Sequence, residues 1–198
     1  GKRPQVPIIV DAAGQVYPLE NLKRYTAMGA DLVGYGAKYV GVFFPRGILC
    51  GRKDLVEAAA LHGFIGFESS ANRSFGRPMK LDRQEIIAVV VALRDWLTMD
   101  HQARFDSYRR RVTNLQRELE VVPGIELAPQ GSPVTSLSVR LDESALGKTA
   151  AAIAEALQRG DPSIWVRCNE DTIDLSVKTI LDGDELVIAS QLKRLLLG

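Results

Sequence analysis

Residues 32–41 read LVGYGAKYVG, a short apolar run that breaks into glycines around one lysine, Lys38. Upstream, residues 6–13 read VPIIVDAA, a second apolar run whose β-branched series ends at Asp11. Short runs of this kind, bounded by Pro, Asp or Gly, are typical of buried strands. Between them, apolar side chains recur at helical spacing over residues 18–28. The sequence therefore predicts a strand, a helix and a second strand, with Asp11 and Lys38 at the ends of the strands.

A carboxylate at one strand end and a lysine at the next are the two groups that pyridoxal 5'-phosphate (PLP) requires. The lysine amine forms a Schiff base with the cofactor aldehyde, and the carboxylate keeps the pyridine nitrogen protonated so that the ring accepts electrons. Open α/β sheets bind ligands at the carboxyl ends of their strands. The residues thus predict PLP as cofactor, with Lys38 as the catalytic Schiff-base lysine and Asp11 as a cofactor-binding residue. Taken singly, Lys38 also fits a surface lysine and Asp11 a turn residue or N-cap.

The composition is that of an ordinary globular protein. The chain has 198 residues, of which 46% are hydrophobic and 25% charged, and this is enough apolar mass for a core. The net charge of +1 gives no broad field for nucleic acid or an anionic membrane. Cys50 and Cys168 lie far apart with no ligand at metal-binding spacing, so we expect reduced thiols in a cytoplasmic protein and no metal site. We expect neither a signal peptide nor a membrane span.

The chain after residue 61 divides into a loop-rich segment and an α+β pattern. Residues 62–80 carry glycines and a proline among aromatic residues and arginines, which is typical of a ligand-contacting loop. A long helix is predicted from Asp82, whose capping box is completed by Glu85. The remaining predicted strands and helices are a helix over 105–119, strands over 125–127 and 134–141, a helix over 150–158, a hairpin of 164–167 with 172–177, and a closing helix over 182–197. We expect a domain boundary near Lys80.

Five motifs resemble the selenocysteine synthase-like group of PLP-dependent enzymes, which are related to L-seryl-tRNA selenium transferase. They are PIIVDAA (7–13), PLENL (18–22), GADLVGYGAK (29–38), GILCGRKDL (47–55) and GRPMK (76–80). The likeness is specific over the first eighty residues. Beyond them, it lies mainly in the pattern of strands and helices.

The resemblance implies an α/β protein with the aspartate aminotransferase fold, known as fold type I. Residues 1–80 would be the C-terminal part of the PLP-binding large domain. Residues 81–198 would form a bridging helix and a small α+β C-terminal domain. A complete enzyme of this group has roughly another half-chain before the position of Asp11, so the resemblance covers a C-terminal portion only.

The resemblance also implies roles for individual residues. It places Lys38 at the Schiff base, Asp11 against the pyridine nitrogen and Gln15 near the ring hydroxyl. Arg77 and Arg167 correspond to anchors for anionic groups of the substrate or cofactor. Outside the resemblance, Arg77 is also explained as a loop charge, and Arg167 as a strand residue that pairs with an acid across its hairpin.

One stretch departs from the family pattern. After its lysine, the group usually has a small polar loop, whereas residues 42–47 here read VFFPRG, which is bulky and apolar. This puts the expected loop contacts with a neighbouring subunit's cofactor in doubt.

The predicted function is that of a PLP-dependent lyase or transferase acting at the α-carbon of a small amino acid or amino sugar. One alternative is a truncated or degenerate non-catalytic module of the same fold that acts through dimerisation or binding. A second alternative is seryl-tRNA selenium transfer, against which the balanced charge argues. The expected partners are a small amino substrate and further copies of the chain, in a homodimer or higher oligomer, with no nucleic acid and no membrane.

Overall fold

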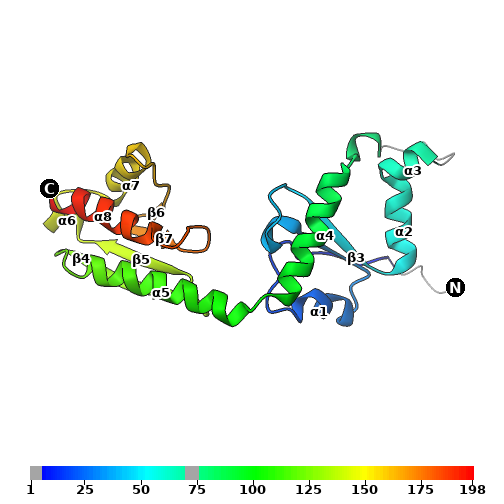
Figure 1. The fold of residues 1–198 in the computed structure, drawn as a ribbon, viewed down its shortest axis with the longest axis horizontal. Coiled ribbons are helices and arrows are strands. Elements are labelled where there is room, and N and C mark those ends of the chain that lie inside the picture. The colour runs from blue at the N-terminus through cyan, green and yellow to red at the C-terminus, as the bar shows by residue number, and fades with distance from the viewer. Residues whose placement is uncertain (1–5, 70–75) are drawn as a thin grey trace. The chain divides into compact units, whose positions relative to one another are not determined.

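The computed structural model describes residues 6–69 and 76–198. The chain divides into two compact units, Gly1–Met99 and Asp100–Gly198 (Figure 1). Over the described ranges, no helix combines the length and the apolarity that crossing a membrane requires.

The first unit is built on a three-stranded sheet with the strand order β1-β2-β3. Its strands are β1 (Ile9–Asp11), β2 (Leu32–Gly36) and β3 (Gly47–Gly51). β1 runs parallel to β2, and helix α1 (Asn21–Ala27) lies in the connection between them. The strand, helix and strand expected from the sequence are therefore all present. β3 pairs antiparallel with β2, which leaves β1 at one edge of the described sheet.

A small hydrophobic core holds the first unit together. Its buried side chains come from β2, from the turns that follow β1 and β2, and from helix α4 (Arg83–Thr98): Ala12, Val16, Val33, Tyr35, Ala37, Val40, Val42 and Trp96. Two hydrogen bonds orient this core. The indole Nε1 of Trp96 donates to the Val16 carbonyl at 3.0 Å, and the Tyr35 hydroxyl donates to the Asn21 carbonyl at 2.8 Å. Helix α4 therefore packs with residues that precede it in the chain.

The segment between β3 and α4 is more helical than its sequence indicates. Its elements are α2 (Lys53–His62), α3 (Phe64–Ser69) and the 3-10 turn η2 (Arg77–Met79). The predicted loop over 62–80 thus contains two short helical elements, and its residues 70–75 lie outside the described ranges. α4 begins with the expected capping box, in which Asp82 N donates to the Glu85 carboxylate at 3.0 Å.

The first compact unit ends at Met99, after helix α4, whereas the boundary predicted near Lys80 precedes that helix. Helix α4 belongs to the first unit because Trp96 packs into the first core. The boundary near Lys80 instead marks the expected end of the PLP-binding large domain, and it stays a prediction.

The second unit contains a four-stranded antiparallel sheet with the order β4-β5-β7-β6. The strands are β4 (Ile125–Gln130), β5 (Ser136–Leu141), β6 (Arg167–Asn169) and β7 (Thr172–Ser176). β4 extends past its predicted end at residue 127 and includes Pro129. An edge strand such as β4 tolerates a proline, because the missing N–H can face away from the neighbouring strand.

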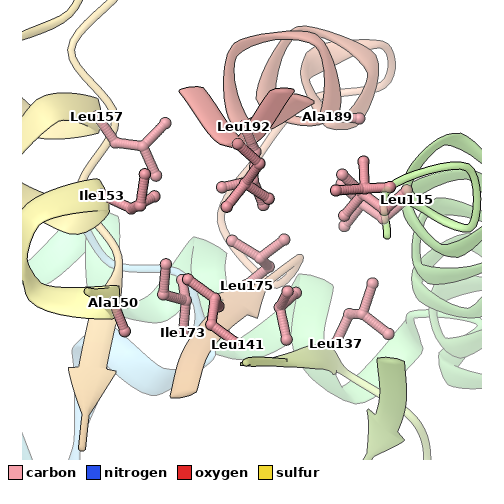
Figure 2. Close-up of a cluster of buried hydrophobic side chains, with 14 of the residues drawn as sticks. Leu115, Leu137, Leu141, Ala150, Ile153, Leu157, Ile173, Leu175, Ala189 and Leu192 are labelled. Carbon is pink, nitrogen blue, oxygen red and sulfur yellow. The ribbon is translucent and has the colours of Figure 1, made fainter. Parts of the chain in front are cut away.

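Three helices cover one face of this sheet. They are α5 (His101–Leu119), α7 (Ala150–Arg159) and α8 (Asp184–Leu197), and the short helix α6 (Glu143–Leu146) lies between β5 and α7. Figure 2 shows Leu115 of α5, Leu157 of α7 and Leu192 of α8 gathered over the β7 side chains Ile173 and Leu175. All five are buried, so α5, α7 and α8 close the core of this unit against the sheet.

A polar seam joins α5 to the start of α8. Arg111 pairs with Asp182 at 2.8 Å, and Asn114 Nδ2 donates to Glu185 Oε1 at 2.9 Å. The second carboxylate oxygen of Glu185 accepts from Gly183 N at 2.9 Å. Burial raises the pKa of Glu185, but the hydrogen bonds from Asn114 and the backbone outweigh it and hold the pKa below its ordinary value of 4.5.

Candidate active site

The turns after β1 and β2 carry the two residues predicted to bind a cofactor. Asp11 is the last residue of β1 and is paired in register with Gly34 of β2. Lys38 follows β2 in the 3-10 turn η1 (Ala37–Val40). Because β1 and β2 are parallel, their carboxyl ends lie at the same end of the sheet. The structure thus brings Asp11 and Lys38 to one end of the sheet, and both residues are exposed.

The turn after β1 is ordered by the Asp11 side chain itself. Its Oδ1 accepts a hydrogen bond from Ala13 N at 3.0 Å, which forms an Asx turn. Gln15 N then donates to the Ala12 carbonyl at 2.8 Å. Gln15 therefore lies in the same turn as Asp11, with its side chain exposed. Its predicted role near the cofactor ring stays a prediction.

The turn that carries Lys38 is closed at its base. Ala37 N donates to the Arg46 carbonyl at 2.8 Å, and Gly41 adopts a positive φ of 99° where the turn ends. Ala37 and Val40 are buried in the first core, one on each side of Lys38. Since these neighbours point inward, the lysine side chain is directed out of the core, at the end of the sheet.

One contact of this turn could not be predicted from the sequence. The Arg46 guanidinium forms an ion pair with Glu85, the capping-box residue at the start of α4. The pair is largely shielded from solvent, and the Arg46 guanidinium, together with the N–H of Asp82, holds the pKa of the Glu85 carboxyl below its usual value. The pair ties the turn that carries Lys38 to the first turn of α4. Glu85 was predictable as a cap, but the partner across 39 residues was not.

Arg77 is engaged in local contacts. Its Nη1 forms an ion pair with Glu68 of α3 at 2.9 Å. Its guanidinium carbon also lies 5.3 Å from the ring centroid of Phe64 and 5.9 Å from that of Phe67. These contacts tie η2 to α3. A ligand anion at Arg77 would compete with Glu68, and the predicted anchoring role stays a prediction.

Arg167 lies in the second unit, on strand β6. It is paired in register with Asp174 of β7, and residues paired across an antiparallel ladder point to the same face. Even so, none of the ion pairs in the described chain involves Arg167. Its role as an anion anchor stays a prediction.

The side chains present suit PLP and offer little to a metal. An amine and a carboxylate stand at the ends of two neighbouring parallel strands, and no ion pair within residues 6–69 and 76–198 involves Asp11 or Lys38. Both groups are thus open to a ligand with an aldehyde carbon and a ring N–H. Across the same ranges, no three His, Cys, Asp or Glu side chains converge on a metal site. Burial raises the pKa of the Cys50 thiol, which makes it a poor nucleophile.

No protein-family model matches the chain, but curated relatives do. It is 33% identical over 172 residues to the 5'-C-glycyluridine monooxygenase-decarboxylase of a Streptomyces species, a match that covers 84% of this chain and 40% of the relative. It is 23% identical to the D-glucosaminate-6-phosphate ammonia lyase of Salmonella typhimurium, over 96% of this chain and 49% of the relative. It is 27% identical to the L-seryl-tRNA(Sec) selenium transferase of Moorella thermoacetica, over 100% and 47%.

Solved structures share the fold. That of D-glucosaminate-6-phosphate ammonia-lyase matches with a TM-score of 0.76 and 22% identity, covering 96% of this chain and 49% of that one. Sphingomonas wittichii serine palmitoyltransferase matches with a TM-score of 0.54 and 14% identity, over 95% and 46%. A structure of SPT with PLP matches with a TM-score of 0.51 and 16% identity, over 96% and 48%.

The chain spans about half the length of the relatives and structures that it matches. The predicted fold is confirmed, since the chain has the architecture of the C-terminal part of fold type I PLP-dependent enzymes. The resemblance to the selenocysteine synthase-like group is confirmed as well, because the homologues of this chain include both the selenium transferase and the ammonia lyase.

Proposed function

We propose that this chain carries the lysine and the carboxylate of a PLP site in an enzyme that acts at the α-carbon of a small amino acid or amino sugar, as a lyase or a transferase. The placement of Asp11 and Lys38 at the carboxyl ends of two adjacent parallel strands is the observation that carries the proposal. The homology to a decarboxylase, an ammonia lyase and a transferase supports it, and so does the fold shared with SPT in its PLP-bound structure.

When bound, PLP supplies a ring that accepts electrons and so stabilises negative charge at the α-carbon of an amino compound. Lys38 Nζ would hold the cofactor covalently, at its aldehyde carbon. The same amine would be the base that takes or returns the proton at the substrate α-carbon. Asp11 would accept the N–H of the pyridine ring and keep that proton in place. Its Oδ1 is oriented for this by the Ala13 N–H.

Two arginines and the relatives support a substrate class for this proposal. Arg77 and Arg167 are proposed to bind anionic groups of the substrate or of the cofactor. At Arg77 this requires a ligand that replaces Glu68, whereas no described carboxylate occupies Arg167. A small amino compound with an acidic group, together with homodimerisation, is therefore our proposal for the partners of the full protein. Two free cysteines agree with a cytoplasmic location.

The absorbance of the full protein loaded with PLP tests the role of Lys38. Lys38→Ala should remove the band of the covalently attached cofactor and abolish turnover. Lys53→Ala, at an exposed lysine of α2 in the same unit, should leave both unchanged. Asp11→Asn should retain cofactor binding but lower turnover at least about 100-fold, since positioned proton-holding groups contribute about 10²–10⁴-fold. An unchanged spectrum in Lys38→Ala would defeat the assignment.

A non-catalytic module of the same fold is the second candidate, and the bulky stretch after Lys38 favours it. Phe43 is 95% exposed, and Phe44 packs against it edge-to-face with the ring centroids 5.8 Å apart. An exposed aromatic pair suits a contact with another protein. A full protein that takes up no PLP at Lys38 but self-associates through this pair would support the module. Seryl-tRNA selenium transfer, the third candidate, would instead require salt-dependent tRNA binding.

A further inference from the structure

Tyr39, the residue next to Lys38, is the side chain in the described site that touches both turns. Its neighbours Ala37 and Val40 are buried in the first core, so Tyr39 points outward together with Lys38. The Lys38 Nζ lies 5.0 Å from the centroid of the Tyr39 ring. This is the range in which an aromatic ring attracts an ammonium group.

The same ring lies against two glycines. A Cβ added to Gly36 would meet the Tyr39 Cδ2 at 3.0 Å and Cε2 at 3.1 Å, and one added to Gly14 would meet Cζ, Cε1 and Cε2 at 3.6–3.9 Å. Gly36 is the last residue of β2, and Gly14 lies in the turn after β1. The two turns are also joined by a hydrogen bond of 2.9 Å from Gly36 N to the Ala13 carbonyl. The Tyr39 ring therefore lies against both the turn that follows Asp11 and the strand end that precedes Lys38.

We propose that Tyr39 is a positioning residue that seats on Gly14 and Gly36 and holds the Lys38 amine at the end of the sheet above the Asp11 turn. This inference rests on the proposed function and deepens it. A lysine side chain has many rotamers, and a ring contact that restricts them keeps the amine close to where the cofactor aldehyde must arrive. Gly36 leaves the room that this packing requires, because a side chain at position 36 would crowd the Tyr39 ring.

The rate at which PLP attaches to the cofactor-free full protein tests this role. Tyr39→Leu removes the ring but keeps an apolar side chain, and it should slow attachment by about two- to fivefold, the factor that one exposed cation–π contact supports. Tyr39→Phe keeps the ring and should attach at the wild-type rate. Equal rates in all three proteins would overturn the proposal, and so would equal slowing in Tyr39→Leu and Tyr39→Phe, because the hydroxyl would then be the active group.

Gly36→Ala provides a second variant that leaves Tyr39 in place. The backbone at Gly36 has a φ of −86°, which alanine adopts freely, so its effect comes from the added methyl group, which would lie 3.0–3.1 Å from the ring and 3.3 Å from the Ala13 carbonyl. It should slow attachment in the wild-type background and add little in the Tyr39→Leu background. Additive slowing in the double variant would contradict a shared mechanism.

A spectroscopic measurement separates positioning from general loosening. In cofactor-free protein whose lysines carry ¹³C-methyl groups, the Lys38 signal should be shifted by the Tyr39 ring in wild type and Tyr39→Phe, and unshifted in Tyr39→Leu. An identical Lys38 shift in all three proteins would overturn the ring contact. Failure of the proposed function gives a different result, since PLP would then not attach to Lys38 in any variant.

Discussion

The second unit encloses its hydrophobic core, whereas the first unit, which holds Asp11 and Lys38, leaves much of its apolar surface exposed. In the second unit, Leu115 and Leu192 have no exposed surface. In the first unit, helix α4 buries Trp96 on one side, but Val90 remains 62% exposed. The other large apolar side chains exposed on α4 are Ile86, Ile87, Val91 and Leu97, which recur at helical spacing.

The edge strand of the first sheet shows the same contrast. Ile9 of β1 is 68% exposed, and the side of β1 away from β2 has no partner strand among the described residues. An exposed apolar edge strand is a template for pairing with further protein. We therefore expect the unit that carries the proposed chemistry to bind further protein at these surfaces, and the second unit to fold without such help.

Separating the units should have the largest effect. Residues 100–198 alone should unfold cooperatively and remain monomeric, because the core of this unit is closed against its own sheet. Residues 1–99 alone should self-associate through the exposed face of α4 and the edge of β1. Light scattering and denaturant unfolding of the two fragments measure both outcomes. A stable monomer of residues 1–99 at high concentration would show that the first unit is as self-contained as the second.

A matched pair of leucines sharpens the contrast within the intact chain. Leu192→Ala leaves a cavity in the second core and should cost about 2–5 kcal/mol of unfolding free energy. Leu97→Ala, on the exposed side of α4, should cost less than about 0.5 kcal/mol. Urea unfolding of both variants measures the difference. A cost at Leu97 equal to that at Leu192 would show that α4 is already covered in solution.

The polar seam of the second unit should give stability a pH dependence. The pKa of Glu185 is lowered on folding, so its contribution is complete above its unfolded pKa and is lost as the pH falls through its folded pKa, below about 4.3. Glu185→Gln retains only one acceptor oxygen for the two N–H donors. It should cost about 1–3 kcal/mol at pH 7 and less at acid pH.

Urea midpoints between neutral and acid pH measure this effect, with the exposed Glu120→Gln as control. The same loss at every pH in Glu185→Gln would mean that the carboxylate charge contributes nothing to the seam.

The smallest effect on stability is expected at Phe43. Because its side chain is 95% exposed, Phe43→Ser should change the unfolding free energy by less than about 0.5 kcal/mol. It should nevertheless weaken self-association if the aromatic pair with Phe44 contacts another subunit. Sedimentation at several concentrations provides the readout. A large loss of stability would show that Phe43 is buried in solution.

Local sequence signals predicted most of the fold. The apolar runs that end at Asp11 and precede Lys38 became β1 and β2, and the capping box of Asp82 and Glu85 begins α4. Apolar runs of strand length, glycines and caps mark where these elements begin and end, so they could be predicted without knowledge of tertiary contacts.

Features that depend on long-range packing were not predictable. Helix α3 spans only six residues and lies in a segment read as a loop, where it is held by contacts of Arg77 with Glu68 and Phe64. The ion pair of Arg46 with Glu85 and the seat of Tyr39 on Gly14 likewise require the fold to bring distant positions together. Within the site, the residue types were therefore readable from the sequence, while the groups that orient them were not.

The attachment site of the cofactor tests the proposed chemistry most directly. The full protein, incubated with PLP and reduced with borohydride, should carry a pyridoxyl group on Lys38. Trypsin would then fail to cut at this position and release a labelled peptide over residues 25–46. A label confined to other lysines, or no label at all, would contradict the assignment of Lys38 and with it the enzymatic function proposed for this chain.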